Sequence, residues 1–149
     1  MSVETMVRLS KLDKIIGVKD ATADLSKTSL QRHLIGKDFI QLSGEDMTAL
    51  ALMAHGGYGC ISVTSNVAPE LCAHLQLACQ SYDYKKALEI QDKLIPLHKA
   101  LFIETSPAPV KYALSLLSYC EDIVRLPLVS VTPETQVVIK DAMIHAGIL

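Results

Sequence analysis

The sequence predicts an α/β fold: three parallel strands with helices between them, followed by a region of helices. Apolar runs too brief for a helix end at Lys19, at Ser43 and at Thr64. A segment whose apolar residues have helical spacing separates each run from the next, and helical patterns dominate after Asn66. Strands that alternate with helices in this way pair in parallel through right-handed crossovers.

Local signals justify the elements of the first part. Ser2 can cap a first helix, and Asp24 or Ser26 can begin a second one that Gly36 stops. Gly44 breaks the second strand, and a glycine-rich turn precedes the third. In chain order we expect a helix over 1–14, a strand over 15–19, a helix over 24–34, a strand over 39–43, a helix over 45–55 and a strand over 60–64.

Prolines organise the second part. Pro69 suits the first turn of a helix, whereas Pro96 predicts a kink or break inside another. Residues 106–109 hold two prolines and are expected to form a rigid linker. The expected elements are helices over 69–80, 84–102, 110–119 and 133–146, with an extended segment over 125–128.

The composition excludes several classes of protein. Half of the residues are hydrophobic and only 5% are aromatic, which is typical of aliphatic α/β packing. The formal net charge is -2 and the basic residues are scattered, so we expect no nucleic-acid partner. No apolar run approaches the roughly 18 residues of a membrane span, so we expect no membrane partner and a cytoplasmic location.

The cysteines and histidines form no metal-binding pattern. The four cysteines contain no C-x-x-C pair and fit free thiols in a reducing compartment, with Cys72 and Cys79 on an apolar helical face. The five histidines lie far apart in sequence. We therefore expect neither a metal site nor a cofactor.

Lys19 is the candidate for chemistry, because it ends a strand expected to be buried. Burying an ammonium group without a partner is costly. One interpretation is that the side chain leaves the strand and extends to water. The other is that desolvation lowers the pKa of the amine, which then attacks a ketone carbon to form an imine. The carboxyl ends of parallel strands are also where α/β active sites collect.

Other candidate sites have simpler interpretations. Glu45 and Asp46 lie where a helix is expected to begin, so we interpret them as helix-start carboxylates rather than as a catalytic pair. The glycines of 56–59 resemble a phosphate-binding loop, but they lead into a strand rather than a helix. Lys111 is expected to lie on a helix surface, and Asp20 is not expected to pair with Lys19, because neighbouring strand residues point to opposite faces.

Motifs along the whole chain resemble those of the dihydrodipicolinate synthase family, within the N-acetylneuraminate lyase superfamily of class I Schiff-base aldolases. Three parallel strands alone would leave two bare edges, which already indicates part of a larger sheet. The matching segments are 15–22 (IIGVKDAT), 42–46 (LSGED), 56–68 (GGYGCISVTSNVA), 96–98 (PLH), 106–111 (SPAPVK), 126–128 (LPL) and 146–149 (AGIL).

The resemblance implies a fold and a reaction. The fold is the carboxyl-terminal part of a (β/α)8 barrel, with the last three strands in 1–66 and a closing barrel helix and helical region in 67–149. The reaction condenses pyruvate with aspartate semialdehyde in lysine and diaminopimelate biosynthesis. Lys19 forms the imine, the backbone carbonyl of Ile61 contacts the pyruvate-derived group, and Gly44 leaves room at the pocket floor.

The chain departs from the family in its length, since a complete barrel needs about 250 residues. The family's two hydroxyl residues for the pyruvate carboxylate, its catalytic tyrosine and its substrate-binding arginine lie in the earlier half, and no tyrosine here matches by motif. We therefore expect weak turnover by the isolated chain, and a homo-oligomer or a pairing with an amino-terminal half-barrel. Two alternatives stay open: a related pyruvate-dependent aldolase acting on another aldehyde, such as a sugar acid, and a non-catalytic interaction module.

Overall fold

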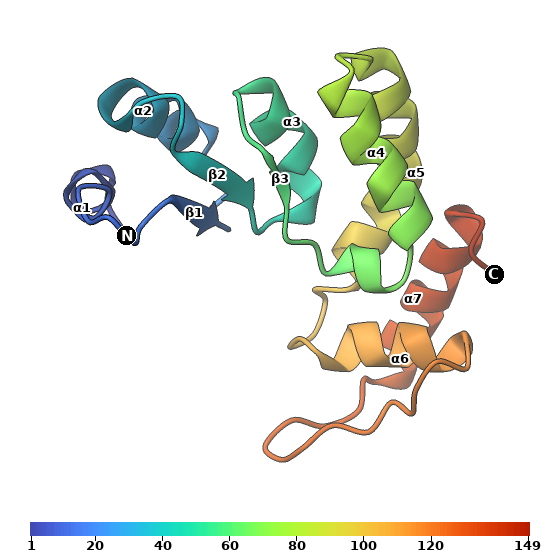
Figure 1. Cartoon of the computed structure of the whole chain (residues 1–149). Coiled ribbons are helices and arrows are strands. Elements are labelled where there is room, and N and C mark those ends of the chain that lie inside the picture. The colour runs from blue at the N-terminus through green and yellow to red at the C-terminus, as the bar shows by residue number, and fades with distance from the viewer. The chain divides into compact units, whose positions relative to one another are not determined.

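The computed structural model describes residues 1–149, which divide into two compact units, Met1–Ser62 and Val63–Leu149 (Figure 1). The first unit holds a sheet of three parallel strands with helices, and the second is helical. The predicted α/β class with a helical region after the strands is confirmed. None of the helices combines the length and apolar character that crossing a membrane requires.

In the first unit β2 is the central strand, and β1 and β3 pair with its two edges in parallel. Ser2 caps α1, and Asp24 caps α2 by accepting the Ser26 N–H at 3.1 Å, as predicted. The elements are α1 (Val3–Leu9), β1 (Gly17–Asp20), α2 (Leu25–Ile35), β2 (Ile40–Ser43), the short 3-10 helix η1 (Asp46–Thr48), α3 (Ala49–Ala54) and β3 (Gly59–Cys60).

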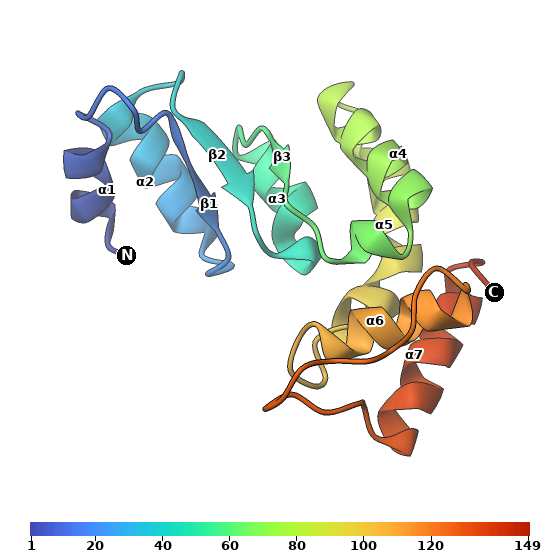
Figure 2. The same cartoon turned by 60° about the horizontal axis from the view of Figure 1, so that its bottom comes forward.

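One face of this sheet is covered and the other is not. Gln41 and Ser43 of β2 are buried, and the Gln41 side-chain amide donates to the Thr28 carbonyl of α2 at 3.0 Å. Figure 2 shows α2 and α3 on one side of the strands. Alternate residues of a strand point to opposite faces, so Ile40 and Leu42 occupy the other face, where both are partly exposed.

The third strand is much shorter than the predicted 60–64. The Ile61 N–H donates to the Ser43 carbonyl at 2.8 Å, but β2 ends there. Beyond that point the chain leaves the sheet and forms a second 3-10 helix, η2 (Thr64–Asn66). The predicted helix over 45–55 is likewise divided, into η1 and α3.

The second unit is built around α5, which packs against α4 and α7 (Figures 1 and 2). Leu94, Leu97 and Leu101 are fully enclosed, together with Ile139 and Met143 of α7. The helices are α4 (Pro69–Gln80), α5 (Tyr84–Ala100), α6 (Ala108–Leu116) and α7 (Pro133–His145). The predicted burial of Cys72 and Cys79 is confirmed, whereas Cys120 is exposed; all four cysteines are free thiols.

Three proline segments differ wholly or in part from the predictions. At Pro96, where a kink or a break is expected, helix α5 is unbroken, and the neighbouring Leu94 and Leu97 are held in the core. The expected linker over 106–109 overlaps the start of α6. Pro109 lies in the first turn of this helix, where a backbone N–H has no helical carbonyl to donate to, so its missing N–H costs no hydrogen bond. The expected extended segment over 125–128 is a turn, closed by the Leu128 N–H and the Arg125 carbonyl at 3.0 Å.

Glu104 holds the start of α7. Its carboxylate accepts the backbone N–H of Thr132, the N-cap of α7, at 3.0 Å and the Thr132 hydroxyl at 3.1 Å. Hydrogen bonds from the Thr135 hydroxyl and from Thr132 lower the pKa of Glu104 from its ordinary value of 4.5. The ionised form is therefore the one that the fold favours.

Glu104→Gln should lower the free energy of unfolding at pH 7, because a neutral amide accepts these hydrogen bonds less strongly than a carboxylate. A carboxyl whose pKa is lower in the folded state contributes stability above its unfolded pKa, and that contribution disappears as pH falls through the folded pKa. Urea unfolding of both proteins over a pH series measures the difference. An equal difference at every pH would contradict the assignment.

Candidate active site

The ends of the three strands meet at one edge of the sheet. Parallel pairing places Lys19 of β1 opposite Leu42 of β2. The Gly44 N–H donates to the Asp20 carbonyl at 2.8 Å, and the Ile61 N–H donates to the Ser43 carbonyl at the same distance. These bonds bring Lys19, Gly44 and Ile61 to the same end of the sheet, although they are up to 42 residues apart in sequence. We call this end, where the carboxyl ends of the three strands meet, the mouth.

The stem of Lys19 lies across Gly44. A Cβ atom built on Gly44 would be 2.6 Å from the Lys19 Cε and 3.1 Å from its Cγ. It would also be 3.0 Å from the Ala21 Cβ. Only a glycine leaves this space open, so the close approach itself explains the residue type at position 44.

The prediction that Lys19 is held in a dry aliphatic pocket is wrong for this chain, because its side chain is exposed. The cause is the uncovered face of the sheet. Leu42 beside it is partly exposed, and Ile61 has 49% of its surface exposed. Its pairing partner Leu42 is aliphatic, but within this chain water reaches both side chains.

Neighbouring polar groups do not engage the Lys19 amine. The Asp20 carboxylate accepts the Thr22 N–H at 2.7 Å and the Thr22 hydroxyl at 2.5 Å. Asp20 is therefore committed to the turn that follows β1 rather than to Lys19, as the alternation of strand residues predicted. Tyr58 precedes β3, so it lies where the strands begin and not where they end. Its hydroxyl donates to the Lys37 carbonyl there at 3.3 Å.

Glu45 and Asp46 have different roles. Glu45 is the N-cap of η1 and accepts the Met47 N–H at 3.0 Å, which confirms the capping interpretation. Asp46 is only 4% exposed, and its carboxylate accepts a short hydrogen bond from the Ser62 hydroxyl. Sequence reasoning missed this bond, since nothing in the pattern connects two residues from different strand ends.

The glycine turn before β3 does not present an anion site. The Gly56 N–H donates to the Met53 carbonyl at 3.0 Å, and the Gly57 N–H donates to the Leu52 carbonyl at 2.9 Å. Both donors thus close the end of α3.

Within the chain no group of three or more His, Cys, Asp or Glu residues could hold a metal ion.

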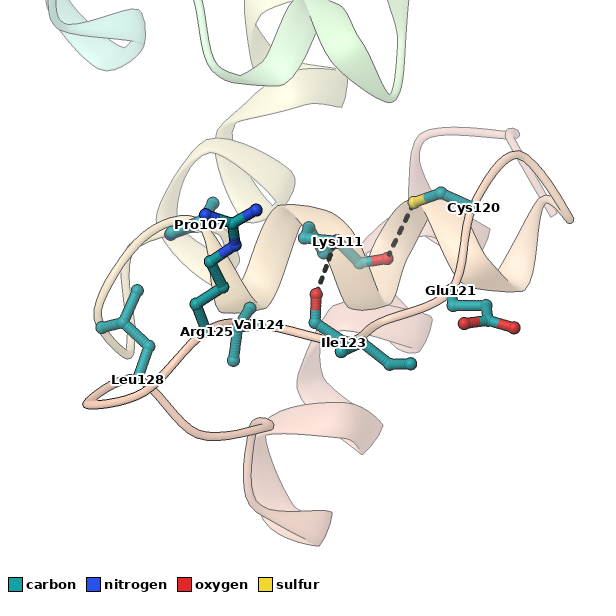
Figure 3. Close-up of a pocket in the computed structure, with 8 residues that line it drawn as sticks. All are labelled: Pro107, Lys111, Cys120, Glu121, Ile123, Val124, Arg125 and Leu128. Atoms are coloured by element: carbon teal, nitrogen blue, oxygen red, sulfur yellow. Dashed lines mark hydrogen bonds between the residues drawn. The ribbon is translucent and has the colours of Figure 1, made fainter.

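The second unit contains a hollow of about 640 Å³ between α6 and the segment after it (Figure 3). Lys111, the other lysine singled out from the sequence, lies at this hollow and donates to the Ile123 carbonyl at 2.5 Å. The Cys120 thiol approaches the Lys111 carbonyl at 4.0 Å. Lys111 therefore fastens the segment after α6 to the helix, which is a structural role.

A family model described as the dihydrodipicolinate synthetase family matches residues 1–146. The chain belongs to this family. The 4-hydroxy-tetrahydrodipicolinate synthase of Afipia carboxidovorans is 58% identical over 149 residues, which are 100% of this chain and 50% of that relative. The chain thus spans about half the length of the curated relatives it matches.

Solved dihydrodipicolinate synthases agree in fold. The enzyme from Aquifex aeolicus matches with a TM-score of 0.94 at 37% identity, over 99% of this chain and 50% of that one. The chloride-inhibited enzyme from Acinetobacter baumannii, complexed with pyruvate, matches with a TM-score of 0.94 at 34% identity, over 99% and 51%. The three strands and the helices after them are the carboxyl-terminal part of a (β/α)8 barrel.

Gly44→Ala should move the Lys19 side chain at small cost in stability. The nearest clashing atom, Cε, is the far end of a flexible chain, and the Ala21 Cβ at 3.0 Å needs to give by only a few tenths of an ångström. Gly17→Ala is the matched comparison: its Cβ would be 2.5 Å from the rigid backbone carbonyl oxygen of Ile40. We expect Gly17→Ala to lower the free energy of unfolding by about 1–3 kcal/mol and Gly44→Ala by less than about 1 kcal/mol.

Urea unfolding measures the stability of both variants. Reductive methylation with carbon-13 formaldehyde reports the surroundings of each lysine amine by NMR. In Gly44→Ala the Lys19 methyl resonance should shift more than that of any other lysine. An unmoved Lys19 resonance would show that its stem does not lie across Gly44.

Proposed function

We propose that this chain supplies the imine-forming half of a 4-hydroxy-tetrahydrodipicolinate synthase, which condenses pyruvate with aspartate semialdehyde in lysine and diaminopimelate biosynthesis. The observation that carries the proposal is the Lys19 stem lying across Gly44 at the mouth of the strand ends. The relatives that bear this enzyme name match the whole chain. The proposal assigns residues 1–66 to the barrel and 67–149 to the closing helix and helical region.

The chemistry begins with attack of the neutral Lys19 amine on the ketone carbon of pyruvate. A carbon–nitrogen bond forms, water leaves, and the product is an imine. The protonated imine withdraws electrons, so a proton is lost from the methyl carbon and an enamine results. The enamine carbon attacks the aldehyde of aspartate semialdehyde. The amino group that came from aspartate semialdehyde then attacks the imine carbon, closes the ring and releases Lys19.

Gly44 and Ile61 have supporting roles in this proposal. The space above Gly44 admits the lysine stem and the carbon skeleton of pyruvate. The backbone carbonyl of Ile61 contacts the pyruvate-derived group from the neighbouring strand end. Ile61 suits this role because its N–H donates to the Ser43 carbonyl at 2.8 Å, which restrains the backbone on the amino-terminal side of its own carbonyl.

Full activity requires a second polypeptide, either an amino-terminal half-barrel or another copy of the chain, over the open face of the sheet. Ile40, Leu42 and Ile61 form an aliphatic surface there, and β1 and β3 each have one unpaired edge. An amino-terminal half-barrel or a second copy of the chain would cover this surface. Removal of water would also lower the pKa of the Lys19 amine, because burial disfavours the ammonium form.

Treatment with pyruvate and sodium borohydride should label Lys19. The expected mass gain is that of one pyruvate minus one water plus two hydrogens. Lys19→Arg removes the nucleophile but keeps the charge, so it should abolish the gain. Lys14→Arg is the matched control on an exposed lysine and should label like the unaltered chain. Peptide mapping that places the label elsewhere would refute the assignment.

The same experiment with the amino-terminal half of the Afipia carboxidovorans relative tests the need for a second polypeptide. Labelling and turnover of aspartate semialdehyde should rise, since each positioned acid–base group contributes on the order of 10²–10⁴-fold. Faster turnover of sugar-acid aldehydes would instead favour the related aldolase. If no label appeared with or without the added half, the result would favour the alternative that the chain is a non-catalytic interaction module.

A further inference from the structure

The bond between Asp46 and Ser62 joins the ends of two neighbouring strands. Asp46 follows β2 by three residues, and Ser62 follows β3 by two. The Ser62 hydroxyl donates to the Asp46 carboxylate in a short hydrogen bond, although 16 residues separate them. Ser62 is also the residue directly after Ile61, so the bond lies next to the Ile61 carbonyl that we propose contacts the substrate.

The burial of Asp46 makes this bond a strong restraint. A carboxylate that is 4% exposed loses most of its hydration, and that loss is costly unless hydrogen bonds replace it. Hydrogen bonds to a charged acceptor are shorter and stronger than neutral ones. Asp46 itself is fixed, because Glu45 caps η1 and the Ser43 hydroxyl donates to the Glu45 carbonyl at 2.8 Å.

Ile61 needs such a restraint because β3 ends before it. Its N–H donates to the Ser43 carbonyl at 2.8 Å, but Ile61 itself lies outside the regular strand, which ends at Cys60. The Ser62 side chain provides a second anchor, on the carbonyl side of Ile61. Two anchors, one on each side, fix the peptide plane that carries the Ile61 carbonyl.

We infer that Asp46 is a positioning residue, which acts through Ser62 to hold the Ile61 carbonyl at the mouth. The inference rests on the proposed function for the role of that carbonyl, and on geometry alone for the restraint. In this proposal Asp46 acts on the Ser62 side chain and not on the substrate. Its carboxylate orients the strand end rather than transferring a proton.

Amide hydrogen exchange tests the restraint without any substrate. Ser62→Ala removes the donor and should accelerate exchange of the Ile61 N–H by about ten- to hundredfold, the range for a lost hydrogen bond to a charged group. Ser62→Thr keeps the hydroxyl and should exchange like the unaltered chain. Ser29→Ala is the matched control: it removes a hydroxyl that lies 3.0 Å from the His55 ring in the same unit, away from the strand ends.

Borohydride trapping tests the consequence for the site, with the amino-terminal half of the Afipia carboxidovorans relative supplied. In Ser62→Ala the pyruvate concentration for half-maximal labelling should rise about tenfold, with the final extent of labelling retained because Lys19 is untouched. Ser62→Thr should restore it. Asp46→Ala should raise it at least as much as Ser62→Ala, and the double variant should be no worse than Asp46→Ala alone.

The outcomes separate the two claims. Unchanged Ile61 exchange in Ser62→Ala, or acceleration of every amide of the unit to the same degree, would overturn the positioning role. Faster Ile61 exchange with unchanged pyruvate dependence would overturn its link to the site. If the unaltered pair of halves traps no pyruvate, the proposed function fails, while the exchange result still decides whether Asp46 holds Ile61.

Discussion

The site depends on the parallel pairing of β1 and β3 with the two edges of β2. That pairing is a small number of backbone hydrogen bonds, yet it brings three residues from distant parts of the chain to one edge. Because parallel strands end at the same side of a sheet, the candidate residues come from the last residues of a strand, as Lys19 does, or from the segment just after one, as Gly44 and Ile61 do. The side chains then act within a frame that the backbone has already set.

Elements with strong local signals were predictable from the sequence. Helix α4 has the predicted bounds because Pro69 fixes its start, and Asp24 and Gly36 mark the ends of α2. Predictions failed where the outcome depends on distant partners. The third strand stops because β2 stops, and α5 continues through Pro96 because its flanking leucines are buried in the core. Neither fact is written in the local pattern.

The candidate site shows the same division. The position of Lys19 at a strand end was predictable, and the family resemblance supplied the roles that we propose for Lys19, Gly44 and Ile61. The exposure of Lys19 was not, because it depends on what lies over the sheet rather than on the strand itself. The contact between Asp46 and Ser62 was also beyond sequence reasoning, since it exists only once two strand ends are adjacent.

Gly17 has a consequence for how the sheet assembles. It faces Ile40 across the β1–β2 pair so closely that a single added carbon would overlap the carbonyl oxygen of Ile40. If β1 slipped by two residues, either Ile15 or Lys19 would have to occupy that gap, and neither fits. If it slipped by one, the side chains would exchange faces. The smallest residue of the strand thus selects a single alignment during folding, and the lysine reaches its glycine only in that alignment.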